Sequence, residues 1–146
     1  MKKGINNELK LVLPATKGNA MVVNKMLSAF LSTIDEINDV KSADIVCAVD
    51  EAVNNVVDHA YIGNNYECDD IVIEVKYTED KITIFVTDKG VGIKDLQQAR
   101  VPLYTSGDSS VHSGMGFTVM ESFSDLLDVK TKDGAGTKVK LVFQMV

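Results

Sequence analysis

A carboxylate and a carboxamide stand four residues apart in one stretch of the chain, at Glu51 and Asn55. The surrounding apolar residues repeat at helical spacing, and side chains four apart on a helix project from the same face. An amide oxygen can bind a hard cation such as Mg²⁺. A carboxylate can position or deprotonate a hydroxyl nucleophile. The pair therefore indicates either a catalytic site or a solvated polar helix face.

A second stretch combines a carboxylate with two glycines, at Asp88, Gly90 and Gly92. It follows an apolar run that alternates like a strand. The glycines allow a sharp turn and the close approach of a flat ligand. The carboxylate can accept a hydrogen bond from an exocyclic amine such as that of adenine. Taken alone, the same residues also fit a plain turn.

A third stretch, residues 113–117, reads Ser-Gly-Met-Gly-Phe and opens a predicted helix. Backbone N–H groups at a helix start favour anions, and glycines let phosphate oxygens come close. The alternative is a helix entry with a flexible hinge. The P-loop, Rossmann, nucleophile-elbow, HExxH and HRD/DFG kinase motifs do not occur, so the corresponding folds are not supported.

The elements that must position these stretches follow from hydrophobic spacing. The predicted elements are a strand Glu8–Leu13, helices Lys17–Ile34 and Ser42–Tyr61, hairpin strands around Ile71–Tyr77 and Ile82–Val86, a helix Met115–Phe123, and strands near Asp125–Lys132 and Thr137–Met145. Ser42 or Asp44 is the expected N-cap of the second helix. Helices and hairpins are grouped rather than alternating, which predicts an α+β fold with helices on one face of a mixed, mainly antiparallel sheet.

The composition limits the domain organisation and the partners. The 146 residues contain no repeat or Pro/Gly/Ser-rich linker, which predicts a single domain over residues 1–146. The formal net charge of −6 disfavours direct binding of nucleic acid or of an anionic membrane surface. No signal peptide or membrane-spanning apolar run is evident, so a cytoplasmic location is expected. Cys47 lies within the apolar pattern of the second helix and is predicted to be a small buried thiol.

Taken in order, the three stretches resemble the N, G1 and G2 boxes of the GHKL ATPase superfamily, which includes gyrase, Hsp90, MutL and histidine kinases. The first box is matched by Glu51, Asn55 and the His-Ala-Tyr at 59–61, and Gly136-Thr137 resembles the terminal Gly-Thr of the superfamily. The run Asp-Glu-Ala-Val at 50–53 is similar to that of anti-sigma factor serine kinases. Residues 99–105 and 113–121 resemble the flanks of the lid in sporulation anti-sigma F factors.

This resemblance implies a GHKL-type two-layer sandwich and a set of site roles. Glu51 would be the catalytic base for a serine hydroxyl, Asn55 would bind Mg²⁺, and residues 100–113 would form a lid over ATP. Asp88 would bind the adenine amine, with Gly90 and Gly92 making room for the base and ribose. The implied nucleotide-binding residues are Asn55, Asp88, Gly90, Gly92, Thr105, Ser113, Gly114, Met115, Gly116, Phe117 and Thr137.

The resemblance also implies an activity and its partners. The chain would sequester a sigma factor, phosphorylate a serine of a STAS-type anti-anti-sigma protein, and form a homodimer. In the related lid, basic residues stand where this chain has Gly107 and His112. Those basic residues would help to neutralise the γ-phosphate. Arg100 remains as a nearby cation. The alternatives are a nucleotide-sensing sigma-binding module with little kinase activity and the catalytic domain of a histidine kinase.

Overall fold

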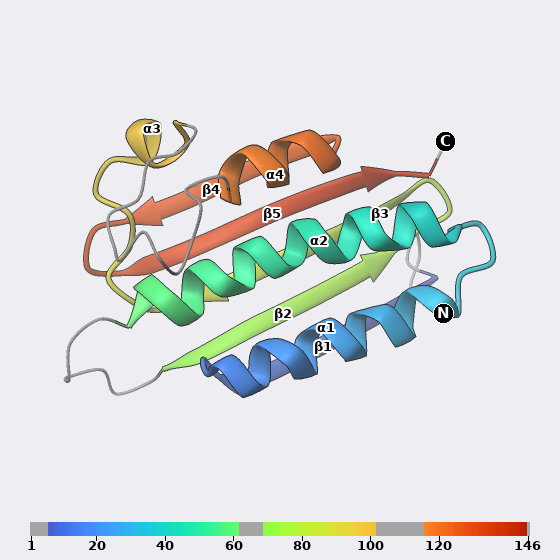
Figure 1. Ribbon diagram of the computed structural model, residues 1–146, viewed down its shortest axis with the longest axis horizontal. Coiled ribbons are helices and arrows are strands. Elements are labelled where there is room, and N and C mark those ends of the chain that lie inside the picture. The colour runs from blue at the N-terminus through green and yellow to red at the C-terminus, as the bar shows by residue number, and fades with distance from the viewer. Residues whose placement is uncertain (1–5, 62–68, 102–115, 146) are drawn as a thin grey trace.

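A five-stranded sheet in the order β1-β2-β3-β5-β4 forms one layer of the molecule. The structure is a computed structural model that describes residues 6–61, 69–101 and 116–145. The strands are β1 (Asn7–Pro14), β2 (Asp70–Tyr77), β3 (Lys81–Asp88), β4 (Leu126–Lys132) and β5 (Gly136–Gln144). The helices α1, α2 and α4 lie against one face of this sheet (Figure 1), which confirms the predicted α+β fold.

All pairings in the described sheet are antiparallel, so the expected parallel component is not found there. The chain order explains this correction. The two helices between β1 and β2 run in opposite directions (Figure 1), so the second returns the chain to the end of the sheet where β1 finishes. The pairs β2–β3 and β4–β5 are hairpins, and β5 also pairs antiparallel with β3. The hairpin predicted between residues 70 and 88 is confirmed, with the Thr78 N–H donating to the Lys81 carbonyl at 2.9 Å.

Helix α1 spans Lys17–Ser32, two residues shorter at its end than predicted. It begins after Thr16, whose hydroxyl accepts a hydrogen bond from the Asn19 N–H at 3.1 Å. This contact satisfies one of the N–H groups that a helix start leaves unpaired. Val23, Leu27 and Leu31 form its buried stripe, as the helical spacing predicted.

Helix α2 spans Asp39–Asn55 and continues as a five-residue π-helix, η1, over Val56–Ala60. Its N-cap is Asn38, whose side-chain oxygen accepts from the Lys41 N–H at 2.8 Å. The prediction of Ser42 or Asp44 as the cap was therefore wrong. Asp39 and Val40 extend the helix by one turn before its apolar stripe begins, and both are exposed, so the hydrophobic pattern did not reveal that turn.

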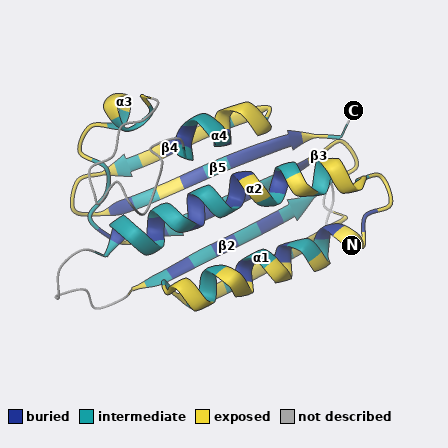
Figure 2. Cartoon of the chain, viewed as in Figure 1, coloured by how far each residue is buried: buried dark blue, intermediate teal, exposed yellow. Residues whose placement is uncertain are grey.

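The core lies between the helices and the inner face of the sheet (Figure 2), where α2 contributes Ile45, Ala48, Val49, Ala52 and Val53. Cys47 is exposed instead of buried, which corrects the sequence prediction. Positions 45, 48, 49 and 52 form the buried stripe. Position 47 lies four residues before Glu51 and is therefore on the same side of the helix as Glu51 and Asn55. Burying α1, α2 and α4 on the sheet leaves this polar side of α2 available for a site.

The connection after β3 contains a short helix, α3 (Leu96–Ala99), which the hydrophobic pattern did not predict. Asp95 caps it by accepting from the Gln98 N–H at 3.0 Å. Helix α4 (Gly116–Phe123) agrees with the predicted helix apart from Met115, which lies outside the described residues. Within the described ranges no helix is both long and apolar enough to cross a membrane.

Candidate functional site

The polar side of α2 meets the first residue of α4. A Cβ placed on Gly116 would lie 3.1 Å from Glu51 Oε2 and 3.7 Å from both Asn55 Oδ1 and Nδ2. A side chain at position 116 would therefore press on the carboxylate and fill the space beside the amide. The structure thus brings the first and third predicted stretches together, although 61 residues separate Asn55 from Gly116 in the chain. Phe117 is buried in the core and holds the start of α4 in place.

Asp88 is buried at the end of β3 and is 7% exposed. Its Oδ1 atom accepts a hydrogen bond from the Gly90 N–H at 2.8 Å, and the Thr137 backbone also donates to the carboxylate. Burial raises the pKa of Asp88, and these two backbone hydrogen bonds act in the opposite direction. Because a carboxylate offers about four acceptor positions, it keeps the capacity to accept a further bond from a ligand amine.

The glycines around Asp88 allow protein backbones to approach one another. A Cβ on Gly90 would lie 1.9 Å from the Ala60 carbonyl oxygen, and one on Gly92 would lie 2.2 Å from the Lys132 carbonyl oxygen. A Cβ on Gly136 would lie 2.2 Å from the Asp88 carbonyl oxygen, and its φ of 100° also favours glycine. The resemblance had assigned Gly90 and Gly92 to make room for the base and ribose. In the structure their Cβ directions are already occupied by backbone.

The loop after Asp88 is tied on two sides by backbone hydrogen bonds. The Val91 N–H donates to the Ala60 carbonyl, and the Gly134 N–H donates to the Val91 carbonyl, both at 2.7 Å. The first bond joins the loop to the end of the helix that carries Glu51 and Asn55. The second joins it to the turn between β4 and β5. The second predicted stretch therefore lies against the first.

Thr137 faces Asp88 in the β3–β5 register, which agrees with the expectation that the two lie close together. Its hydroxyl lies 2.9 Å from that of Thr131 on β4, and the Thr131 hydroxyl accepts from the Ile93 N–H at 2.8 Å. Sequence reasoning did not single out Thr131, because an alternating Thr in a strand carries no distinctive pattern. Its part in holding the loop becomes visible only from the strand register.

Arg100, expected to remain as a cation near the phosphates, is paired with Glu121 on α4. Its Nε atom donates to Glu121 Oε1 at 2.7 Å, and its Nη2 atom contacts the same oxygen. In this conformation the guanidinium is engaged by a carboxylate. Thr105, Gly107, His112, Ser113, Gly114 and Met115 lie outside the described residues.

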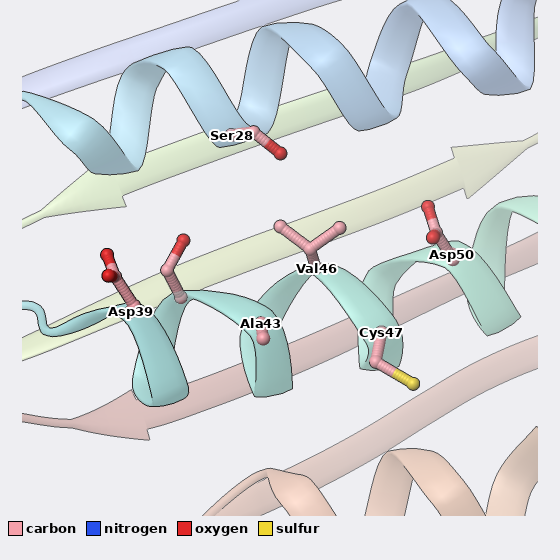
Figure 3. A pocket seen from close by; sticks show the side chains of 7 residues that line it. Ser28, Asp39, Ala43, Val46, Cys47 and Asp50 are labelled. Atoms are coloured by element: carbon pink, nitrogen blue, oxygen red, sulfur yellow. The ribbon is translucent and has the colours of Figure 1, made fainter.

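A separate pocket of about 390 Å³ lies between α1 and α2 (Figure 3), lined by Ser28, Asp39, Ser42, Ala43, Val46, Cys47 and Asp50. Asp50 accepts from the Asn24 side-chain amide at 2.8 Å, and burial raises the pKa of Asp50. Partial desolvation of the exposed Cys47, and then the carboxylates of Glu51, Asp50 and Asp44, raise the pKa of its thiol. The two carboxylates in the lining would repel a polyphosphate, so this pocket does not suit the chemistry of the three stretches.

Residues 13–143 match the family model described as the histidine kinase-like ATPase domain. The "Anti-sigma F factor" of Clostridium beijerinckii (strain ATCC 51743 / NCIMB 8052) is 43% identical over 138 residues, with 92% of each chain covered. The chain belongs to the anti-sigma F factor family of histidine kinase-like ATPase domains. This finding confirms the family that the order and spacing of the three stretches indicated.

Further members of the family are similar over most of their length. The "Anti-sigma F factor" of Clostridium perfringens (strain SM101 / Type A) is 41% identical over 142 residues, covering 92% of this chain and 94% of that one. The "Anti-sigma F factor" of Oceanobacillus iheyensis (strain DSM 14371 / CIP 107618 / JCM 11309 / KCTC 3954 / HTE831) is 35% identical over 141 residues, covering 97% and 94%.

A solved structure supports the same fold. The chain is similar to one from "The crystal structure of SiaB-SiaC complex from Pseudomonas aeruginosa", with a TM-score of 0.69 and 12% sequence identity. The alignment covers 97% of this chain and 91% of that one. At this identity the comparison bears on the fold alone, and it agrees with the helix-on-sheet architecture.

Proposed function

We propose that the chain is an anti-sigma factor and an ATP-dependent protein serine kinase. It sequesters a sigma factor and phosphorylates a serine of a STAS-type anti-anti-sigma protein. Membership of the anti-sigma F factor family supports the anti-sigma activity. The observation that carries the kinase activity is the meeting of Glu51 and Asn55 with Gly116 at the start of α4. There a metal ligand, a base and helix N–H groups are within reach of one triphosphate.

The donor set fits Mg²⁺ bound together with ATP. Asn55 supplies an amide oxygen, and Mg²⁺ in kinase sites commonly takes one or two protein ligands and completes its shell with phosphate oxygens and water. No cluster of three His, Cys, Asp or Glu side chains that could bind a metal occurs among the described residues, and this mode of binding requires none. When bound, Mg²⁺ neutralises charge that develops on the phosphates.

The chain's own residues take distinct roles in the proposed reaction. Asp88 accepts a hydrogen bond from the adenine amine, and Thr137 lies beside it. The N–H groups at the start of α4 bind phosphate oxygens, with Ser113, Gly114 and Met115 preceding them in the chain. Glu51 accepts the proton of the serine hydroxyl as the serine oxygen bonds to the γ-phosphorus, while the bond from that phosphorus to the β–γ bridging oxygen breaks and ADP leaves. Thr105 and the lid over residues 100–113 exclude water and so reduce wasteful hydrolysis.

In the proposed cycle a homodimer in its ATP state holds the sigma factor in the cytoplasm, without contact to nucleic acid or membrane. The STAS protein competes for the same kinase, and its phosphorylation releases the kinase to hold sigma again. A second candidate, a sigma-binding module with little kinase activity, is favoured by the Arg100–Glu121 pair, which engages a cation expected near the phosphates. The histidine-kinase alternative has less support, since the similar relatives are anti-sigma F factors over most of the chain.

Phosphoserine formation separates these functions. The wild-type chain is incubated with Mg-ATP and its STAS partner, and the partner is examined by mass spectrometry. We expect phosphoserine with the wild type, ATP binding without transfer for Glu51→Gln, and loss of Mg-ATP binding for Asn55→Ala. Tight ATP binding by the wild type without any phosphoserine would leave only the sigma-binding module. Normal transfer by Glu51→Gln would remove Glu51 from the role of base.

A further inference from the structure

The hydroxyl group of Tyr61 joins three elements at the base of the site. It donates a hydrogen bond to the Asp70 carbonyl at 2.6 Å, where β2 begins. It accepts one from the Lys89 N–H at 2.9 Å, directly after Asp88. Tyr61 itself follows the π-helix η1 at the end of α2. One side-chain oxygen therefore bridges the end of α2, the start of β2 and the turn after β3.

The turn whose Lys89 N–H donates this bond is the one that carries the buried carboxylate. Lys89 lies between Asp88 and Gly90, whose N–H donates to Asp88 Oδ1 at 2.8 Å. The adjacent residue Ala60 accepts from the Val91 N–H at 2.7 Å and blocks the Cβ direction of Gly90. Ala60 and Tyr61 thus hold the turn through consecutive contacts, Ala60 with its backbone carbonyl and Tyr61 with its side-chain hydroxyl.

The π-helix determines where these two residues point. An α-helix turns by about 100° per residue, and a π-helical turn accommodates one residue more than an α-helical turn. If α2 continued as a regular α-helix through residues 56–60, Tyr61 would be rotated about the helix axis by the turn of one residue, roughly 100°, from its present direction. The Ala60 carbonyl and the Tyr61 hydroxyl would then miss the Lys89–Val91 backbone. The local irregularity is therefore what couples the α2 helix to the turn.

We propose that Tyr61 is a positioning residue that makes the site selective for adenine over guanine. The inference rests on the proposed nucleotide binding. Adenine presents an exocyclic amine that donates to a carboxylate, whereas guanine presents a carbonyl oxygen at the equivalent position, which repels one. Discrimination of this kind requires the carboxylate to stay in place. Tyr61 fixes the backbone on the C-terminal side of Asp88 and so limits the positions its carboxylate can adopt.

The test measures base selectivity in Tyr61→Phe, which keeps the ring and removes the bridging oxygen. Calorimetry gives the affinities for Mg-ATP and Mg-GTP, and their ratio does not depend on the folded fraction of the sample. We expect the ATP affinity to fall about 10-fold and the ATP/GTP ratio to fall about 5-fold, as one lost hydrogen bond would produce. The matched control is Tyr77→Phe, because the Tyr77 hydroxyl contacts Glu36 at 3.4 Å at the opposite end of β2. It should change neither value.

Amide exchange provides a second readout, and its wild-type measurement does not depend on any variant folding. In the wild type, the Lys89 N–H should exchange slowly because Tyr61 accepts its bond, and in Tyr61→Phe it should exchange at least 10-fold faster. An unchanged ATP/GTP ratio in Tyr61→Phe, or fast exchange of Lys89 in the wild type, would overturn the inference. A wild type that bound neither nucleotide would instead contradict the proposed function.

Discussion

The two ends of the β2–β3 hairpin are made from the same strands and differ in what their polar groups contact. At the closed end, the Thr78 hydroxyl donates to Asp80 Oδ1 at 2.7 Å, so these two side chains pair within the turn. The Asp80 carbonyl also accepts from the Met145 N–H at 2.8 Å. At the open end, the buried Asp88 receives bonds from Gly90 and from Thr137 on another strand. The side-chain contacts of the closed-end turn are local, whereas the buried carboxylate at the open end is held by segments far apart in the sequence.

The two ends of the hairpin differ in how many residue types their turns allow. Many short polar sequences could close a hairpin as residues 78–81 do. At the open end, backbone from α2 and from the β4–β5 turn approaches so closely that Gly90 and Gly92 admit no side chain. A buried carboxylate is also costly unless it is hydrogen-bonded. We therefore expect substitutions at the open end to affect both stability and nucleotide binding, and those at the closed end to affect stability alone.

The largest effect is expected from Gly90→Ala. The new Cβ would lie 1.9 Å from the Ala60 carbonyl oxygen, so the turn or the end of α2 must move. We expect the free energy of unfolding to fall by about 3 kcal/mol, measured by urea denaturation, and ATP binding to be lost. The control is Gly18→Ala, whose Cβ would come no closer than 3.9 Å to the Thr16 hydroxyl and should cost little. Equal stabilities of the two variants would refute the close packing at Gly90.

Asp88→Asn should have the next largest effect, on affinity. The substitution replaces a charged acceptor of the adenine amine by an amide of similar shape, and we expect ATP binding to weaken about 30-fold by calorimetry. The matched control is Asp80→Asn at the closed end, where affinity should stay unchanged. If both variants bound ATP like the wild type, Asp88 would not contact the base.

The two carboxylates should also give stability opposite dependences on pH. Burial raises the pKa of Asp88 above 3.8, so its contribution to stability is greatest below 3.8 and declines as pH rises through the raised value. A hydrogen bond from Thr78 lowers the pKa of Asp80 below 3.8, so its contribution is present above 3.8 and is lost as pH falls through the lowered value.

Urea denaturation over a pH series measures this contrast. Relative to the wild type, Asp88→Asn should gain stability as pH rises above 3.8, and Asp80→Asn should gain stability as pH falls below 3.8. The same pH dependence for both variants would contradict the difference in burial between the two ends.

The smallest effect is expected from Thr78→Ala at the closed end. It removes a hydroxyl whose bonds to Asp80 and to the Lys81 carbonyl are exposed. The free energy of unfolding should fall by about 1 kcal/mol or less, with no change in ATP affinity. A loss of affinity in this variant would show that the two ends are coupled through the strands.

The strands and buried stripes could be predicted because each depends on local alternation or helical spacing, as at Ile71, Ile73 and Val75. The three site stretches could be predicted from residue type and order. The π-helix at Val56–Ala60 could not, because it depends on how α2 fits against the turn after β3. The same holds for the bridging hydroxyl of Tyr61 and the contact of Gly116 with Glu51. These contacts join residues that are distant in the sequence, and no local pattern encodes them.

The most direct test of the account is a crystal structure with Mg²⁺ and a non-hydrolysable ATP analogue. We expect the triphosphate between Asn55 and the start of α4, and the base against Asp88. A nucleotide bound elsewhere, for example in the α1–α2 pocket that includes Ser28 and Asp50, would contradict the convergence of the three stretches on one site.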